Sequence, residues 1–176
     1  LDRQMCDAGA LVKEVLREFE GLGHARHLRL HCHVAQNTPR LSVDAARLLQ
    51  LIRNLVSNAV KFSPEHAQVW VEIRPDTIAH AGRMVPAVTM SVCDQGPGIP
   101  ADELESVFDK FVQSSKTRTG AGGTGLGLAI CREIASAHGG RIHAENMDNG
   151  GARFVVTIPA AVTDPSTPED SEEYHL

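Results

Sequence analysis

Apolar residues recur at helical spacing in three stretches of the chain, and each stretch predicts a helix. The three expected helices cover residues 8–20, 43–62 and 124–138. The stretch "GLG" is expected to end the first helix, and Gly139-Gly140 the third. The second is expected to end at Ser63-Pro64, because the residue before a proline disfavours helical backbone.

Other stretches alternate between apolar and polar residues, which is typical of strands. Strands are expected at residues 27–34, 67–73 and 87–94, with a terminal hairpin of 141–147 and 152–159 around "DNGG". The residues between the second and third strands, "RPDTIAHAGRMVP", are interpreted as a polar excursion, and 101–111 as the start of a short helix. Because helices and strands interleave without strict alternation, we expect a sheet covered on one face by helices.

The second helix carries an unusual polar stripe. At about 100° per residue, Asn58 lies about 40° from Asn54 around the helix and Lys61 about 20° on the other side. Asparagine is a mediocre helix former, because its side chain competes for backbone hydrogen bonds. A solvated face is the plain alternative, but such a face more often holds Glu, Lys or Gln. The stripe is therefore a candidate binding surface.

Two glycine-rich stretches follow. In "DQGPGIP", Asp94 ends an apolar strand, and Gly96 and Gly98 come directly after it. A buried carboxylate there can accept a hydrogen bond from an amino group, and glycines allow a flat ligand close to the backbone. A turn-forming aspartate is the plain alternative. In "GGTGLGLA", glycines lead into the third helix, whose free N–H groups form an anion site.

Two familiar phosphate-binding motifs do not fit the second stretch. A P-loop requires lysine where Leu126 stands, although Gly120 and Gly125 have the P-loop spacing. A dinucleotide fingerprint requires a strand directly before the glycines, and "SSKTRTGAGG" is not one. Together these features indicate a nucleotide site. The amides and the lysine can bind oxyanions and a hydrated metal, the acidic turn can bind a base, and the glycine-rich helix start can bind phosphates.

Four motifs in order, "NLVSNAVKFS", "DQGPGIP", "VFDKF" and "GGTGLGLAI", closely resemble the catalytic ATP-binding domain of sensor histidine kinases. This domain belongs to the Bergerat-fold ATPase and kinase superfamily, and the likeness runs from about residue 41 to 159. It implies an α/β two-layer sandwich with a mixed, mostly antiparallel sheet of about five strands and the three helices on one face. It also implies ATP and Mg²⁺ as cofactors.

The resemblance implies a role for each matching residue. Asn54 and Asn58 would bind Mg²⁺ and phosphates, and Asn54 and Lys61 would take part in catalysis. Asp94 would hold the adenine amino group, in a pocket shaped by Gly96, Gly98 and Ile99. Phe108 and Phe111 would anchor a mobile ATP lid at about residues 112–123. The expected phosphate contacts are Lys116, Arg118, Gly123, Thr124, Gly125, Leu126 and Gly127.

One position separates branches of this superfamily, and two departures qualify the likeness. Hydrolytic members carry a glutamate four residues before the key asparagine, where this chain has Asn54, so transfer is favoured over hydrolysis. Gln113 stands where relatives often have an arginine that reaches the γ-phosphate, a role that Lys116 or Arg118 could take. None of the nine histidines has the sequence context of the family's phosphoacceptor.

Composition adds the domain limits. Five of the 22 acidic residues lie in the tail "TDPSTPEDSEEYHL", which leaves 17 acidic residues against 17 basic ones in the body. We therefore expect a domain at 1–160, a disordered acidic tail at 161–176, and no nucleic-acid partner. The four scattered cysteines favour a reduced compartment, and no apolar run reaches the roughly 20 residues needed to span a bilayer. The opening at Leu1 suggests a fragment.

The resemblance also implies partners and location. They are an upstream dimerisation domain that carries the acceptor histidine, a response regulator downstream, and a homodimeric whole protein. The domain would be cytoplasmic and would not contact a membrane itself, which allows anchoring of the whole protein in a bacterial inner membrane. An ATP-sensing interaction module and a hydrolytic ATPase are the alternative functions. His31 and His33 share a strand face, but with no third ligand evident they are interpreted as ordinary strand residues.

Overall fold

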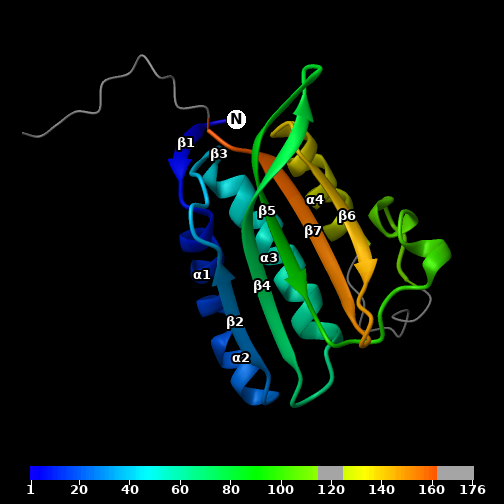
Figure 1. The fold of residues 1–176 in the computed structure, drawn as a ribbon. Coiled ribbons are helices and arrows are strands. Elements are labelled where there is room, and N and C mark those ends of the chain that lie inside the picture. Colours follow the sequence, from blue (N-terminus) through cyan, green and yellow to red (C-terminus); the bar gives the residue numbers. More distant parts are fainter. Residues whose placement is uncertain (115–124, 162–176) are drawn as a thin grey trace, which may run out of the picture.

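The computed structural model describes residues 1–114 and 125–161 of the chain. Within these residues, five strands form the main sheet in the order β2-β4-β5-β7-β6 (Figure 1). The strands are β2 (Arg29–Val34), β4 (Gln68–His80), β5 (Arg83–Cys93), β6 (Arg141–Asn146) and β7 (Ala152–Pro159). β2 runs parallel to β4, and the remaining neighbours are antiparallel. The predicted mixed, mostly antiparallel sheet is confirmed.

Three longer helices cover one face of this sheet, so the molecule has two layers (Figure 1). They are α1 (Ala8–Glu18), α3 (Ala45–Phe62) and α4 (Gly127–Ala137). The core between the layers includes Leu51, Leu55, Val71, Met90 and Val156, each no more than 2% exposed. The three expected helices are confirmed. Among the described residues, none of the helices has the length and apolar character required to cross a membrane.

Local signals place helix α3, which carries the polar stripe. Asp44 caps its start, because the Asp44 side chain accepts a hydrogen bond of 3.2 Å from the backbone N–H of Arg47. Ser63 ends it in extended backbone, as expected for a residue before proline. The buried face of α3 consists of Leu48, Leu51, Ile52, Leu55, Val56, Ala59 and Val60.

The first helix differs from the prediction at its end. α1 stops at Glu18, and a second helix, α2 (Glu20–Ala25), follows directly and includes both glycines expected to end the first helix. A glycine weakens a helix by only about 1 kcal/mol relative to alanine, which neighbouring contacts can offset. Gly23 has a packing reason as well, because a Cβ atom there would lie 3.1 Å from the Leu30 side chain.

A small second sheet was not predicted. β1 (Arg3–Cys6) pairs with β3 (Leu41–Asp44) in antiparallel fashion, so α3 begins at Ala45 and not at Val43. Each strand has 4 residues. Such short strands give too few alternations to stand out in the sequence. The antiparallel pairing itself joins segments far apart in the chain.

The prediction that residues 74–86 form a polar excursion between two strands was wrong. β4 and β5 continue as a long hairpin that extends past the helices (Figure 1). Its turn is Ala81-Gly82, with φ of 50° and 75°, as a two-residue hairpin turn with positive φ at both positions requires. Pro75 fits because β2 pairs with β4 only as far as Ile73, so beyond that point the outer edge of β4 needs no donor.

Two further boundaries differ. The segment 101–111 forms two separate 3-10 turns, η1 (Ala101–Glu103) and η2 (Ser106–Phe108), in place of one short helix. α4 starts at Gly127, since Gly125 has a φ of 74° that a helix does not allow. Residues 115–123 of the expected lid (about 112–123) and residues 162–176 of the expected tail (161–176) lie outside the described residues.

Candidate nucleotide site

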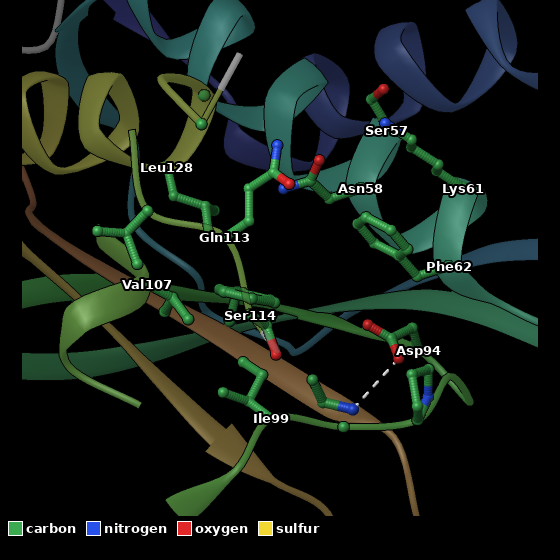
Figure 2. Close-up of a pocket in the computed structure, with 17 residues that line it drawn as sticks. Ser57, Asn58, Lys61, Phe62, Asp94, Ile99, Val107, Gln113, Ser114 and Leu128 are labelled. Carbon is green, nitrogen blue, oxygen red and sulfur yellow. Dashed lines mark hydrogen bonds between the residues drawn. The ribbon is translucent and has the colours of Figure 1, made fainter. Parts of the chain in front are cut away.

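A cavity of about 280 Å³ lies between α3, the start of α4 and the sheet (Figure 2). Polar side chains from α3 lie on one side of it, and Asp94, directly after β5, on the other. Its described lining residues are Ser57, Asn58, Lys61, Phe62, Asp94, Pro97, Gly98, Ile99, Val107, Val112, Gln113, Ser114, Gly125, Gly127, Leu128, Ala152 and Phe154. The three motif regions identified in the sequence therefore meet at one place.

The polar stripe of α3 divides between the cavity and its edge. Asn58 and Lys61 line the cavity. Asn54, one turn earlier, lies against α4, where its Nδ2 donates a hydrogen bond of 3.3 Å to the carbonyl oxygen of Gly127. This bond uses the amide nitrogen and leaves the Oδ1 atom of Asn54 as an acceptor for a donor or cation.

Asp94 is the buried carboxylate of the site, with 5% of its surface exposed. Its Oδ1 atom accepts hydrogen bonds from the backbone N–H groups of Gly96, at 2.8 Å, and Ala152, at 3.2 Å, and Figure 2 draws the second of these. Burial raises the pKa of Asp94, and these two hydrogen bonds partly oppose that rise. Both bonds go to Oδ1, so Oδ2 is the atom that can accept a hydrogen bond from an amino group in the cavity.

The two glycines after Asp94 have packing reasons that the sequence did not show. A Cβ atom on Gly96 would lie 2.8 Å from the carbonyl oxygen of Phe62, at the end of α3. Gly98 has a φ of 74°, and a Cβ atom there would lie 2.8 Å from Oδ1 of Asn146. Gly98 lines the cavity, whereas Gly96 does not. These glycines let the turn fit between α3 and the β6–β7 end of the sheet.

Asn146 holds this turn, and sequence reasoning missed it. Its side chain makes two hydrogen bonds with the backbone of Ile99: Oδ1 accepts from the N–H at 2.8 Å, and Nδ2 donates to the carbonyl at 2.6 Å. Asn146 is the last residue of β6 and lies 47 positions from Ile99 in the chain. Since its only local signal is an asparagine at a strand end, the sequence pattern could not reveal this pairing.

Replacing Asn146 by alanine should loosen the turn. Two hydrogen bonds of this kind contribute together about 1–2 kcal/mol, so the free energy of unfolding in urea should fall by about that amount. ATP affinity should fall too, because Ile99 and Gly98 line the cavity. Asn149→Ala, at an exposed position of the same β6–β7 turn, is the control. Equal effects of the two substitutions would show that Asn146 does not position the turn.

The start of α4 faces the cavity through Gly127 and Leu128. Within the described residues α4 has no side-chain hydrogen bond at its cap and no acidic residue in its first turn. The unpaired N–H groups of a helix start carry partial positive charge, which adds to the charge of Lys61 on the same cavity. An anion is therefore favoured at this end, away from the carboxylate of Asp94.

Gly125 and Phe111 lie together at the base of the expected lid. The N–H of Phe111 donates to the carbonyl oxygen of Gly125 at 3.0 Å, and a Cβ atom on Gly125 would lie 2.8 Å from the Phe111 backbone. The Phe111 side chain is 75% exposed and does not line the cavity, and neither does Leu126. Phe108, by contrast, is buried and packs edge-on against Phe154, with ring centroids 6.1 Å apart.

Apolar side chains form the middle of the cavity. Ile99, Val107, Leu128 and Phe154 line it, and Val107 and Leu128 lie across the cavity from Asp94 and Lys61 (Figure 2). Apart from Ile99, these wall residues were not predicted, because an apolar wall residue and an ordinary core residue have the same sequence pattern. A flat apolar ring with an amino group at one edge and a polyanion at the other matches this arrangement.

Four predicted contacts cannot be placed. Lys116, Arg118, Gly123 and Thr124 lie outside the described residues. Gln113, noted in the sequence as a departure at the arginine position, lines the cavity together with Ser114. The residue that stands at the usual arginine position, Gln113, is therefore within reach of a bound ligand.

Comparison with known proteins identifies the family. The family model described as "Histidine kinase-, DNA gyrase B-, and HSP90-like ATPase" matches residues 43–162. The chain is 34% identical to the adaptive-response sensory kinase SasA of Prochlorococcus marinus (strain MIT 9303), over 89% of this chain and 40% of SasA. It is 33% identical to the alginate biosynthesis sensor protein KinB of Pseudomonas aeruginosa, over 90% of this chain and 25% of KinB. The chain thus spans less than half of either relative.

Solved structures agree. The nucleotide-free catalytic domain of histidine kinase ThkA superposes with a TM-score of 0.75 at 30% identity, covering 90% of this chain and 96% of that domain. Full-length ShkA in complex with AMPPNP gives a TM-score of 0.75 at 29% identity, covering 93% of this chain and 32% of ShkA. The chain therefore belongs to the histidine kinase-, DNA gyrase B- and HSP90-like ATPase family, as a catalytic ATP-binding domain of the sensor histidine kinase type.

Proposed function

We propose that residues 1–160 bind ATP with Mg²⁺ and donate its γ-phosphoryl group to a histidine on a separate helical dimerisation domain, in two-component signalling. The observation that carries this proposal is the polarity of the cavity. A buried carboxylate lies on the sheet side, and an amide, a lysine and a helix start lie toward α3 and α4. This arrangement binds a base and a polyphosphate in one defined direction.

Each end of the cavity has a task in this proposal. Oδ2 of Asp94 accepts a hydrogen bond from the adenine amino group, while Gly98 and Ile99 flank the base. Asn58, Lys61 and the N–H groups from Gly125 to Gly127 hold the phosphates. Gly96 acts by keeping the turn in place. The proposal extends the phosphate contacts to Lys116, Arg118, Gly123 and Thr124.

The residues at the phosphate end fit Mg²⁺. This ion prefers oxygen ligands and keeps several of its waters, so one or two amide oxygens are sufficient. Asn58 lines the cavity, and Asn54 keeps its Oδ1 atom available because Nδ2 is bound to Gly127. When bound, Mg²⁺ neutralises phosphate charge; the chain's own residues orient the nucleotide and exclude water around the γ-phosphate.

Transfer is favoured over hydrolysis. Among the described residues that line the cavity, Asp94 is the one carboxylate, and it serves the base end. A hydrolytic enzyme needs a group that takes a proton from water near the γ-phosphate. With Asn54 at the position where hydrolytic members carry glutamate, the protein supplies positioning and charge neutralisation, which are the main means of catalysing phosphoryl transfer.

The relatives suggest partners for the whole protein. ThkA has been solved in complex with the response regulator protein TrrA, and this chain superposes on ThkA in that complex with a TM-score of 0.72 at 28% identity, over 90% of this chain and 42% of that chain. We extend this to a response regulator for the present protein, to an upstream dimerisation domain with the acceptor histidine, and to a homodimer. We place the domain in the cytoplasm, where ATP is available, with the whole protein anchored in a bacterial inner membrane.

Calorimetric titration of ATP tests the nucleotide site. The wild-type chain should bind ATP more tightly with Mg²⁺ than without it. Asn58→Ala should weaken binding in Mg²⁺ by about tenfold and should reduce the benefit of Mg²⁺, because one amide at the phosphates is lost. Gln50→Ala removes an amide from the same helix outside the cavity and should bind as the wild type does. Identical affinities of the Asn58→Ala and Gln50→Ala variants would refute the assignment.

Phosphoryl transfer needs a second experiment. Joined to an acceptor-histidine hairpin, the chain should incorporate label from γ-labelled ATP as acid-labile phosphohistidine. ATP binding without any phosphohistidine would favour an ATP-sensing interaction module. Sustained phosphate release over many turnovers by the chain alone would favour a hydrolytic ATPase.

A further inference from the structure

A cluster of two histidines and a glutamate lies where two turns of the chain meet, beyond the end of α3. His27 lies between α2 and β2, and Glu65 and His66 lie between α3 and β4. The three residues each offer one ligand atom, and these atoms lie within 4.8 Å of one another. In the described part of the chain, this cluster is the one group of three or more His, Cys, Asp or Glu side chains close enough to share an ion.

The backbone fixes the two turns relative to each other. The N–H of His66 donates to the carbonyl of Arg26 at 3.3 Å, and the N–H of Arg29 donates to the carbonyl of Ala67 at 3.1 Å. The Arg26 guanidinium donates to the carbonyls of Val60 and Ser63 at the end of α3. The segments that carry the ligands are therefore held in place, and a bound ion would have little backbone to order.

The side chains already converge. Nδ1 of His27 and Oε1 of Glu65 are 2.9 Å apart, and the rings of His27 and His66 are stacked with centroids 4.9 Å apart. The His27 and Glu65 side chains are 61% and 59% exposed, so both can rotate and an ion can enter from solvent. A zinc ion at about 2.0–2.2 Å lies in the plane of each imidazole that binds it, so one of the two stacked rings must rotate before both nitrogens face one ion.

The local charges permit a cation. Glu65 supplies one negative charge beside the two imidazoles at neutral pH, as an ordinary exposed glutamate does. Arg26 is the nearby cation, but its charge is directed at the carbonyl groups of the α3 C-terminus, where the helix dipole is negative.

We propose that His27, Glu65 and His66 bind Zn²⁺ or a similar divalent transition metal, with water completing the coordination. Two imidazoles and a carboxylate are a ligand set that suits zinc, copper and nickel, whereas Mg²⁺ prefers oxygen ligands alone. The ion joins the α2–β2 turn to the end of α3, the helix that carries Asn58 and Lys61. The site is separate from the nucleotide cavity, because none of its three residues lines that cavity.

Thermal unfolding of the nucleotide-free chain with added ZnCl₂ tests the site. Zinc at about a hundred times its dissociation constant should raise the unfolding midpoint by about 5–10 °C, and MgCl₂ should not. Because His27 and His66 have positive φ of 56° and 68°, asparagine is the suitable replacement, since it tolerates that backbone. His27→Asn, His66→Asn and Glu65→Gln should each weaken zinc binding in calorimetry by at least about tenfold.

The chain offers a matched control. His31 and His33 are also two histidines with ring nitrogens close together, 3.2 Å apart, but among the described residues they have no third ligand. The double variant His31→Asn/His33→Asn should keep the zinc affinity of the wild type. Loss of zinc binding in this double variant, or wild-type affinity in the His66→Asn variant, would overturn the proposal. Because no nucleotide is present, either outcome leaves the proposed kinase function untouched.

Discussion

Asp94→Asn should lose most of the affinity for ATP while keeping the fold. The asparagine side chain has the same shape as aspartate. Its amide oxygen can still accept the hydrogen bonds that the N–H groups of Gly96 and Ala152 donate to Oδ1 of Asp94. The amide nitrogen then takes the place of Oδ2 and presents a donor to the amino group of the base. Loss of a hydrogen bond to a charged group costs about 1.5–3 kcal/mol, so the dissociation constant should rise by about 10- to 150-fold.

Stability should move in the opposite direction from binding. Burial raises the pKa of Asp94, so the folded chain holds this proton more tightly than the unfolded chain does. The contribution of Asp94 to stability is therefore greatest at low pH and falls as the pH rises from the ordinary aspartate value of about 4 through the raised value. Without nucleotide, Asp94→Asn should be more stable than the wild type at neutral pH, and the difference should vanish in acid.

Calorimetry with ATP and urea unfolding at two pH values measure both effects on the same two proteins. Wild-type ATP affinity in the variant would show that Asp94 does not hold the base. Lower stability of the variant at neutral pH would show that the two backbone hydrogen bonds, and not the burial of a charge, dominate at this position.

Gly151→Ala should be the most destabilising small substitution at the site. Gly151 has a φ of 89°, and a Cβ atom there would lie 1.9 Å from the carbonyl oxygen of Asp94 and 3.0 Å from the Cα of Gln95. The overlap forces β7 and the start of the "DQGPG" turn apart. The strained φ costs about 1–2 kcal/mol and the overlap about 1–3 kcal/mol more, so the free energy of unfolding should fall by about 2–5 kcal/mol.

The neighbouring residue separates the two causes. Gly150 has a φ of 90°, nearly the same, but a Cβ atom there would meet nothing within 4 Å. Gly150→Ala should therefore show the cost of the backbone conformation alone, about 1–2 kcal/mol in urea unfolding. If both variants lose the same stability, the close approach of Gly151 to Asp94 is not what makes glycine necessary. Only Gly151→Ala should also weaken ATP binding, because it displaces Asp94.

The parts of the fold with strong periodicity were predictable. Helix α3 combines a buried apolar face with Asp44 at its start and Ser63-Pro64 at its end, so its existence and its end followed from local chemistry. The same holds for the hairpin of β6 and β7. Asp94 was recognisable because a carboxylate after an apolar strand and before two glycines is uncommon unless a ligand or a tight turn requires it.

Features that depend on contacts between distant segments were not predictable. Asn146 and Ile99 pair across the site, and nothing near either residue in the sequence points to the other. The reason for glycine at position 96 is the carbonyl of Phe62, which only the packing of α3 brings there. The hairpin of β4 and β5 was missed because Pro75 and Pro86 are typical of loops, and only the end of the β2–β4 pairing at Ile73 shows that Pro75 sits on an open edge.

The same long hairpin gives the domain a natural place for new chain ends. A Cβ atom on Gly82 would meet nothing within 4 Å, and Met84, two residues further on, is 66% exposed, so the tip lies in solvent. The nucleotide cavity and the cluster of His27, Glu65 and His66 both lie elsewhere in the fold. A circularly permuted chain opened between Ala81 and Gly82, or one carrying an inserted fluorescent reporter there, should still fold and bind. The tip is thus a position at which a label can be attached without disturbing either site.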